Sequence, residues 1–381
     1  MASFNIDQSG QISKIMRTPR RVDVEITSKC NLKCKYCYYF NNKDINYIDL
    51  PTNEWLQFFD ELGNLAVMNV RITGGEPFIR KDLHELIDGV VRNSMRFSIL
   101  SNGSLISADM AAFLADTGRC DYVQISIDGS TSEIHDSCRG KGSFNGAIRG
   151  IHILQIHRVP VNVRVTIHHN NIYDLENITS FLLEDLKLDR FSTNSASTFG
   201  SCNQNAKEVL LSTQERIIAM ETLSRLSKKY EGRILASAGP LAEMRTWSSM
   251  ERARQQRDSR FNGGGYLTSC GCANTGLSVR SDGIITPCLL MSHIELGRIN
   301  RDSLSELWLK SHQLNALRNR CNIPLQNFDF CNECPYIPYC TGDCPAHAYN
   351  LTGHVNHPCP DGCLRKFLAD GGRIPTMEHG D

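Results

Sequence analysis

The cysteines of this chain lie in groups, and this grouping constrains the fold more than any other feature of the sequence. Of the 16 cysteines, only Cys120, Cys138, Cys202 and Cys321 stand apart from the others. The grouped ones are Cys30, Cys34 and Cys37 near the N-terminus, and Cys270, Cys272, Cys288, Cys331, Cys334, Cys340, Cys344, Cys359 and Cys363 in the last third. Thiols that only fill a core do not cluster in this way, whereas metal ligands do. We therefore expect a metal centre in each region.

Composition indicates where the chain works and what it does not bind. No apolar run is long enough to span a membrane, and the N-terminal segment lacks the apolar core of a secretory signal, so a cytoplasmic location is expected. Disulfides do not persist in the cytoplasm, but thiolates that bind metal do. The 41 Lys and Arg residues balance 41 Asp and Glu residues. This balance argues against a nucleic-acid partner and against an anionic membrane surface.

Strand and helix patterns alternate between residues 21 and 235. Period-two runs predict strands at 21–27, 67–73, 96–100, 122–127 and 161–167, with a weaker one near 190–193. Apolar residues at helical spacing predict helices near 52–62, 83–91, 107–117, 143–157, 173–186 and 212–230. The alternation predicts an α/β fold with a parallel sheet and right-handed crossovers, either open or closed into a barrel.

Four successive strands end in polar or glycine-rich residues. CNLKCKYC (30–37) follows the first strand, GGEP (74–77) the second and SNG (101–103) the third, and Ser126 and Asp128 stand at the end of the fourth. The carboxyl ends of parallel strands share one rim of the sheet, where such folds carry their chemistry. We expect these residues to meet at one site.

The last third of the chain has a different character. From about residue 235 the alternation stops, and GGG (263–265) introduces a loop-rich, cysteine-rich tail. A tail of this kind is ordered by metal rather than by apolar burial. The expected organisation is a lead-in over 1–20, a strand and helix domain over 21–235, a bridging segment over 236–262 and a cysteine-rich domain over 263–381.

The spacing within the first cysteine group favours one kind of metal centre. Three cysteines separated by three and then two residues can hold three corners of a cubane cluster and leave one iron without a protein ligand. An iron with an open position can bind a small molecule and do chemistry on it. A zinc ion completed by a distant His or Cys is the alternative at this point.

The motif C-x-x-x-C-x-aromatic-C at 30–37, followed by GGEP after the next strand, resembles the radical S-adenosylmethionine (SAM) superfamily. The resemblance covers residues 21 to about 235 and implies a partial (β/α)6 TIM-like barrel. It implies that Cys30, Cys34 and Cys37 are catalytic and bind a 4Fe-4S cluster whose fourth iron is chelated by the amino and carboxylate groups of SAM. Electron transfer into SAM would yield a 5'-deoxyadenosyl radical that removes a hydrogen atom from the substrate.

The same resemblance assigns SAM-binding roles to the second loop. Gly74 and Gly75 would leave backbone groups bare for the amino group of SAM, because a side chain there would block the approach. Glu76 and Pro77 would complete the loop.

Further residues of the rim receive roles in the same way. Tyr36 would lie beside the adenine, Asn102 would line the site, and Ser126 and Asp128 would contact the ribose or the carboxylate of SAM. The planar guanidinium of Arg139 suits it to bind a carboxylate through two hydrogen bonds; the alternative is that Arg139 forms a surface salt bridge. Arg164, in a strand that faces the same cavity, allows the same two interpretations.

The tail reads C-x-x-C-x-x-x-x-x-C-x-x-x-C at 331–344, and four such ligands suit a zinc knuckle or a rubredoxin-like iron. With the cysteines on either side, the pattern resembles the SPASM extension of radical SAM peptide-modifying enzymes, which carries two auxiliary 4Fe-4S clusters. The resemblance implies Cys270, Cys272, Cys288 and Cys344 as ligands of the nearer cluster, and Cys331, Cys334, Cys340 and Cys363 as ligands of the farther one.

Two details of this ligand set are particular to the chain. Only one residue separates Cys270 from Cys272, which departs from the family pattern and leaves open a nearer cluster with three ligands and an open iron. Cys363 is preferred to Cys359 as the last ligand, because the pattern leaves a longer gap after Cys344.

The resemblance implies an oxidoreductase that acts on a peptide with SAM and three 4Fe-4S clusters. Sulfatase-maturing (formylglycine-forming) relatives carry an acidic residue directly after the equivalent of Cys288, whereas this chain has Leu289. We therefore expect oxidative modification of a ribosomally made peptide, most simply a cross-link, as in the maturases of SynChlorMet cassettes. Anaerobic sulfatase maturation is the alternative within the family, and a non-catalytic zinc or iron-sulfur scaffold is the alternative outside it.

The partners follow from this expectation. They are a peptide or protein substrate and a reductant such as flavodoxin or ferredoxin. Many peptide maturases begin with a winged-helix domain that binds the leader peptide, but only 29 residues precede Cys30. A separate recognition protein, or the barrel mouth and the tail, would then bind the leader.

Overall fold

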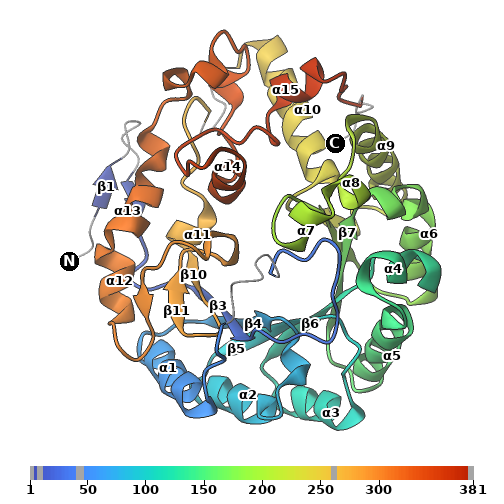
Figure 1. Ribbon diagram of the computed structural model, residues 1–381, viewed down its shortest axis with the longest axis vertical. Helices are drawn as coiled ribbons and strands as arrows, with labels where there is room; N and C mark the ends of the chain where they lie inside the picture. The colour runs from blue at the N-terminus through green and yellow to red at the C-terminus, as the bar shows by residue number, and fades with distance from the viewer. Residues whose placement is uncertain (1–3, 7–11, 40–46, 259–263, 376–381) are drawn as a thin grey trace.

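The computed structural model describes residues 4–6, 12–39, 47–258 and 264–375 (Figure 1). Near the N-terminus, β1 (Phe4–Ile6) and β2 (Ile12–Lys14) form a short antiparallel hairpin outside the main sheet. The expected boundary at residues 262 and 263 lies outside the described residues. Among the described helices, none has the length and apolar character needed to cross a membrane.

Six parallel strands lie side by side in the order of the sequence. They are β3 (Arg21–Thr27), β4 (Asn69–Gly74), β5 (Arg96–Ser101), β6 (Cys120–Ser126), β7 (Val161–Ile167) and β8 (Phe191–Ser195). Each overlaps a strand expected from the sequence. The predicted α/β fold with a parallel sheet is therefore confirmed.

Helices cover the outer side of these strands, as Figure 1 shows. They are α1 (Thr52–Asn64), α2 (Leu83–Arg92), α3 (Ala108–Asp116), α4 (Ser132–Arg139), α5 (Ser143–Ile156), α6 (Leu175–Ser180) and α9 (Thr213–Lys229). The short helices α7 (Ser201–Gln204) and α8 (Ala206–Val209) follow β8. The predicted helix at 173–186 is split, because a π-helical turn at Phe181–Asp185 follows α6.

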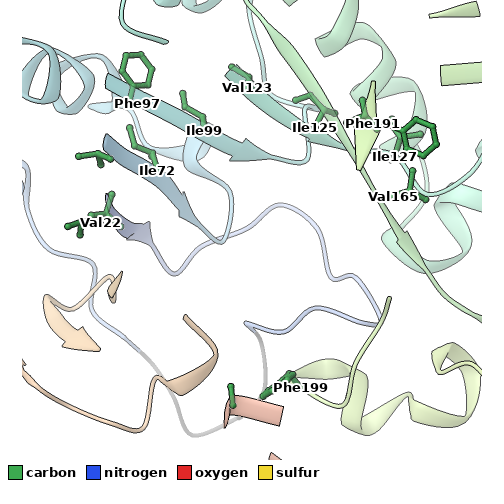
Figure 2. Close-up of a cluster of buried hydrophobic side chains, with 14 of the residues drawn as sticks. Val22, Ile72, Phe97, Ile99, Val123, Ile125, Ile127, Val165, Phe191 and Phe199 are labelled. Atoms are coloured by element: carbon green, nitrogen blue, oxygen red, sulfur yellow. The ribbon is translucent and has the colours of Figure 1, made fainter. Parts of the chain in front are cut away.

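The two faces of each strand differ in polarity, because side chains alternate across a strand. Val22, Ile72 and Ile99 come from successive strands and are fully buried in the core that also contains the apolar residues of the helices (Figure 2). The opposite face is polar: Asp23 on β3 pairs in register with Arg71 on β4, and their side chains form an ion pair. The sheet therefore presents an apolar face to the helices and a polar face to the interior.

The strand and helix alternation continues further than the sequence suggested. β9 (Ile234–Ala236) adds to β8 as a parallel strand, and α10 (Pro240–Gln256) follows it within the segment expected to be a bridge. The helix was missed because its apolar positions, among them Leu241, Met244 and Trp247, are interrupted by polar residues. These three side chains are nonetheless buried.

The cysteine-rich tail joins the same sheet at its other edge. β10 (Gly276–Val279) pairs in parallel with β3, and β11 (Ile284–Thr286) and β12 (Gly297–Arg298) continue antiparallel. The full order is β12-β11-β10-β3-β4-β5-β6-β7-β8-β9. The rest of the tail holds α11 (Gly271–Asn274), α12 (Leu304–Lys310), α13 (His312–Arg318), α14 (Pro345–Thr352) and α15 (Leu364–Ala369).

Candidate functional site

The loop after β3, which carries Cys30, Cys34 and Cys37, is tied down at its start and its middle. Asp49 accepts hydrogen bonds from the Thr27 hydroxyl and from the Ser28 backbone N–H, both at 2.6 Å. Further along, the Lys35 N–H donates to the Cys138 carbonyl at 2.8 Å. The three cysteines thus lie on a loop that is held at its start by Asp49 and at its middle by α4.

Hydrogen-bond donors lie around two of these thiols. The Leu32 N–H lies 3.4 Å from the Cys30 Sγ atom, and the Asn102 side-chain amide lies 4.0 Å from the same atom. Nη1 of Arg139 lies 4.0 Å from the Cys34 Sγ atom. Burial raises the pKa of both thiols, while these donors oppose the rise. Donors of this kind favour the thiolate, which is the form that binds iron, so the residues fit a cluster.

The GGEP loop packs directly on the backbone of the cysteine loop. The Gly75 N–H donates to the Thr27 carbonyl and the Glu76 N–H to the Lys29 carbonyl, both at 2.8 Å. A Cβ atom added at Gly75 would lie 2.1 Å from the Lys29 oxygen, and one at Gly74, where φ is +136°, would lie 2.4 Å from the Thr27 oxygen. Close contact with the backbone of Thr27 and Lys29 therefore requires glycine at both positions, in addition to the expected need to leave backbone groups accessible to SAM.

Glu76 joins the second loop to the third. Its buried carboxylate accepts hydrogen bonds from the Ser101 hydroxyl and the Asn102 N–H, both at 2.8 Å, and from the Phe78 N–H at 3.2 Å. Burial raises the pKa of Glu76 to about 7, although these donors act against the rise. Pro77 follows at the first position of a short 3-10 helix and is buried. Glu76 thus positions Asn102, whose side chain reaches Cys30.

Asp128, Arg139 and Tyr36 form one buried group. The Asp128 carboxylate accepts hydrogen bonds from Nε of Arg139 and from the Tyr36 hydroxyl, and from the Thr166 N–H at 2.7 Å. The Arg139 guanidinium lies 5.3 Å from the centre of the Tyr36 ring. Asp128 is fully buried and Arg139 is 7% exposed. Arg139 is therefore not part of a surface salt bridge; it connects Asp128 to Cys34.

Two histidines complete this group and were not singled out from the sequence. Nδ1 of His135 accepts from the Asp128 N–H at 3.1 Å, and the His168 ring stacks on Tyr36 with 5.4 Å between ring centres. Burial lowers the pKa of each to about 4, so both are neutral at physiological pH. His168 directly follows β7, so the signal that identified the earlier strand ends, a polar residue after a strand, would have found it.

Ser126 and Arg164 are neighbours across two strands of the interior face. They pair in register between β6 and β7. Nε of Arg164 donates to the Ser192 hydroxyl at 3.2 Å, and burial together with nearby Arg71 lowers the pKa of Arg164. The Arg164 guanidinium thus lies on the polar face beside a residue expected to contact SAM.

The tail brings together the four cysteines expected around the nearer auxiliary cluster. The thiols of Cys270 and Cys288 both interact with that of Cys272, and this interaction lowers the pKa of Cys270 and Cys288 and raises that of Cys272. Burial raises the pKa of Cys344, and the Cys270 thiol, which is close enough to act on it electrostatically, adds to the rise. Cys270 has a φ of +60°, which is rare outside glycine, and this backbone turn accompanies the unusual one-residue spacing.

A second set of tail cysteines lines a cavity. The cavity is small, about 20 Å³, and is lined by Cys331, Cys334, Cys340, Cys359 and Cys363 among others. Burial raises the pKa of Cys331 to about 12, and Cys340, Cys334 and Cys363 add to the rise, so these four lie close together. For Cys359 the added charges are those of Asp343 and Asp361 instead. In the described ranges, no three His, Cys, Asp or Glu side chains are arranged around a single metal ion.

Comparisons with known sequences identify two protein families in this chain. Residues 24–182 match the profile of the Radical SAM superfamily, and residues 270–335 match that of an iron-sulfur cluster-binding domain, SPASM. Fe-coproporphyrin III synthase of Methanosarcina barkeri (strain Fusaro / DSM 804) is 30% identical over 87% of this chain and 84% of that protein. PqqA peptide cyclase of Rhizobium meliloti (strain 1021) is 26% identical over 92% of this chain and 88% of that protein.

A solved structure shows the same fold. Streptococcus suis SuiB bound to its precursor peptide SuiA superposes with a TM-score of 0.69 at 17% identity, over 92% of this chain and 77% of that chain. The cysteine loop on the strand ends, the two tail cysteine sets and the 30% identical relative lead to one conclusion. The chain belongs to the radical SAM superfamily, as an enzyme with a SPASM iron-sulfur cluster-binding domain.

Proposed function

We propose that this enzyme is a peptide maturase that cleaves SAM reductively and oxidatively modifies a ribosomally made peptide, most simply by forming a cross-link. The observation that carries this proposal is the apolar turn after Cys288. Leu289 begins a short 3-10 helix, Leu289–Met291, whose three side chains are all apolar. The residue directly after Cys288 is therefore not the acidic residue that a formylglycine-forming enzyme carries there as its proton acceptor, which disfavours formylglycine formation.

The relatives support a peptide substrate. The similarity to PqqA peptide cyclase extends over most of both chains, barrel and tail included. The fold likeness to SuiB with its precursor peptide indicates that an architecture of this kind accommodates a peptide. Both observations favour a peptide substrate that binds on the inner side of the sheet, where the strands present polar side chains.

Formation of a coproporphyrin is the second candidate, favoured by the 30% identity to Fe-coproporphyrin III synthase. A coproporphyrin carries several carboxylates, so a site for it needs a surplus of cations. On the inner strand face described above, Arg71 is paired with Asp23, and Glu25 on β3 is also buried there. This mixture of charges suits a peptide better than a polyanionic ring.

The proposed division of labour follows the two parts of the chain. The barrel over 21–235 would hold one 4Fe-4S cluster on Cys30, Cys34 and Cys37, and the tail over 263–381 would hold two auxiliary clusters. Bound SAM and its cluster supply a 5'-deoxyadenosyl radical that takes a hydrogen atom from the substrate. Asn102 and Arg139 position the cysteine loop, and Asp128 orients Arg139. The auxiliary clusters suit a reaction in which the substrate must also lose an electron.

Iron content and product mass test the proposal together. Anaerobically prepared enzyme should contain about twelve irons per chain. Reduced enzyme, SAM, a flavodoxin or ferredoxin reductant and the precursor peptide encoded beside the gene should give a peptide lighter by two hydrogens per cross-link, read by tandem mass spectrometry. A separate leader-recognition protein is included in a parallel reaction.

The control is the enzyme with Cys30→Ala, Cys34→Ala and Cys37→Ala, which should form no 5'-deoxyadenosine and leave the peptide unchanged. Formation of Fe-coproporphyrin III from a tetrapyrrole precursor, with no change in the peptide, would overturn the peptide proposal in favour of the second candidate. Formylglycine on a sulfatase-motif peptide would restore the sulfatase reading, and stoichiometric zinc with little iron would favour a scaffold.

A further inference from the structure

Arg320 is a buried cation whose guanidinium is largely without partners in the protein. It lies in the 3-10 helix Asn319–Asn322, and its side chain is 0% exposed. Its Nε donates to the Thr268 carbonyl at 3.0 Å. Nη1 and Nη2 are also buried, and neither atom has a hydrogen-bond partner among the residues that the structure describes. Four N–H groups of one charged side chain therefore point into the protein without an acceptor.

A buried arginine without an acceptor is costly, and it cannot relieve the cost by losing its proton. The guanidinium stays charged in proteins, so it requires a negative group nearby. The Nε contact holds Arg320 against Thr268, two residues before Cys270, and the thiols that act electrostatically on Arg320 are those of Cys344, Cys270 and Cys272. These are three of the four expected ligands of the nearer auxiliary cluster.

We propose that Arg320 donates hydrogen bonds to the iron-sulfur cluster held by Cys270, Cys272, Cys288 and Cys344, and thereby raises its reduction potential. A 4Fe-4S cluster with four thiolate ligands is an anion, and it becomes more negative when reduced. A fixed cation with free N–H groups stabilises the reduced form more than the oxidised form, and hydrogen bonds to the sulfurs are a known determinant of cluster potential. Arg320 is thus a positioning and tuning residue, which favours transfer of an electron to this cluster.

The farther set of cysteines has no equivalent of Arg320 among the described residues. Arg365 is the cation that acts on Cys331 and Cys363, but its Nη1 donates to the Asn332 carbonyl at 2.6 Å and its Nη2 to the Phe330 carbonyl. Both Nη atoms of Arg365 therefore donate to the backbone, whereas neither Nη atom of Arg320 has a partner among the described residues. We expect a change at Arg320 to affect one tail cluster and leave the other unchanged.

Arg318 is a matched control for Arg320. It is 4% exposed, and its Nη2 also lacks a partner. However, its Nε donates to the Ala273 carbonyl at 2.8 Å and its Nη1 to the Trp308 carbonyl at 2.7 Å, and it stacks on the Trp308 ring. Burial alone lowers the pKa of Arg318, with no contribution from a cysteine. It shares the burial of Arg320 but not its thiolate neighbours.

The test is a redox titration of the full-length, cluster-loaded enzyme, followed by electron paramagnetic resonance. Cys30→Ala, Cys34→Ala and Cys37→Ala are introduced first, so that only the tail clusters titrate. Arg320→Gln should lower the midpoint potential of one tail cluster by about 59 mV or more, which is a tenfold change in the ratio of oxidised to reduced cluster for a one-electron couple. Arg320→Lys keeps the charge and should shift it less, and Arg318→Gln should not shift it.

Cluster loss also discriminates. If Arg320→Gln loses about four irons while Arg320→Lys and Arg318→Gln keep them, the cluster requires the cation, as proposed. Full iron with unchanged potentials in both Arg320 variants would overturn the proposal. So would equal iron loss in all three variants, because a general need for buried arginines would then explain it. The inference rests on the tail ligand set and not on the peptide, so a failed peptide assay would leave it standing.

Discussion

At the scale of single residues, the tightest contacts of the site are between backbones rather than between side chains. Gly75 touches the Lys29 carbonyl so closely that no Cβ fits, and Gly74 has the same relation to Thr27. Two loops that hold the cluster and SAM in this family are thus fitted to each other, and a change in one displaces the other.

Gly75→Ala should therefore remove iron and SAM binding together. The added Cβ would lie 2.1 Å from the Lys29 oxygen, which is backbone and cannot rotate away, so the cysteine loop must shift. We expect loss of about four irons per chain with loss of SAM binding, measured by iron analysis and equilibrium dialysis. Gly118→Asn is the control, because Gly118 has φ of +58° and open space around it, and Asn tolerates that conformation. Loss of SAM with full iron would instead favour a role for Gly75 in exposing backbone to SAM.

Glu76 predicts a pH dependence of stability. Its pKa rises from an ordinary 4.5 to about 7 in the folded protein. The folded state therefore binds the proton more tightly than the unfolded state. Proton binding by Glu76 therefore stabilises the folded state by about 3 kcal/mol at pH values below 4.5, and this stabilisation is lost as the pH rises towards 7.

Denaturant unfolding of the wild type and of Glu76→Gln, from about pH 5 to about pH 8, measures this effect. The stability of the wild type relative to the variant should fall as the pH rises. His135 and His168 titrate in the opposite sense, since their pKa values are lowered to about 4, but they are present in both proteins and cancel. A constant difference across this range would contradict the prediction.

At the scale of elements, α15 supports the prediction that Cys363 completes the farther set. Cys363 is the N-cap of this helix, and its Sγ atom accepts from the Lys366 N–H at 3.5 Å. The same thiol lies within electrostatic reach of Cys331 and Cys340. A helix start thus directs Cys363 towards the other cysteines, whereas the charges acting on Cys359 are Asp343 and Asp361.

Cys363→Ala should lower the iron content of the tail, and Cys359→Ala should lower it less, because Cys363 interacts electrostatically with Cys331 and Cys340 whereas the charges that act on Cys359 are Asp343 and Asp361. Iron and sulfide analysis of the two purified variants measures the difference. The reverse order would assign the last ligand to Cys359, and equal losses would indicate that both substitutions act through the packing around the cavity.

At the scale of the whole molecule, the barrel and the tail share one sheet. The tail strand β10 pairs with β3, the strand that leads into the cysteine loop. This pairing closes the edge that β3 would otherwise expose, and unpaired edges promote association. The tail therefore supports the strand that leads into the cysteine loop of residues 30–37, in addition to carrying its own two sets of cysteines.

Removal of the tail after residue 258 should therefore destabilise the barrel. We expect the fragment to aggregate, because the edge of β3 loses its partner, and size-exclusion chromatography measures this. Deletion of residues 1–14 is the control, because β1 and β2 lie outside the main sheet. A monomeric fragment that still binds four irons and SAM would show that the barrel folds without β10.

The sequence by itself determined the parallel strands, the helices around them and the grouping of functional residues at the strand ends. These follow from local information: side-chain periodicity defines each strand, and parallel strands must bring their carboxyl ends to one rim. The family resemblance carried by the motif at 30–37 was confirmed, because ligand spacing along a loop is itself a local property.

Only the tertiary structure decided what depends on residues distant in the sequence. α10 was missed because its apolar stripe is weak on its own and is stabilised by packing. The pairing of β10 with β3, the buried position of Arg139 and the unpartnered guanidinium of Arg320 each depend on contacts between distant segments. Periodicity and spacing describe what a segment does with its neighbours in the chain, whereas burial of a charge is a property of the surrounding fold.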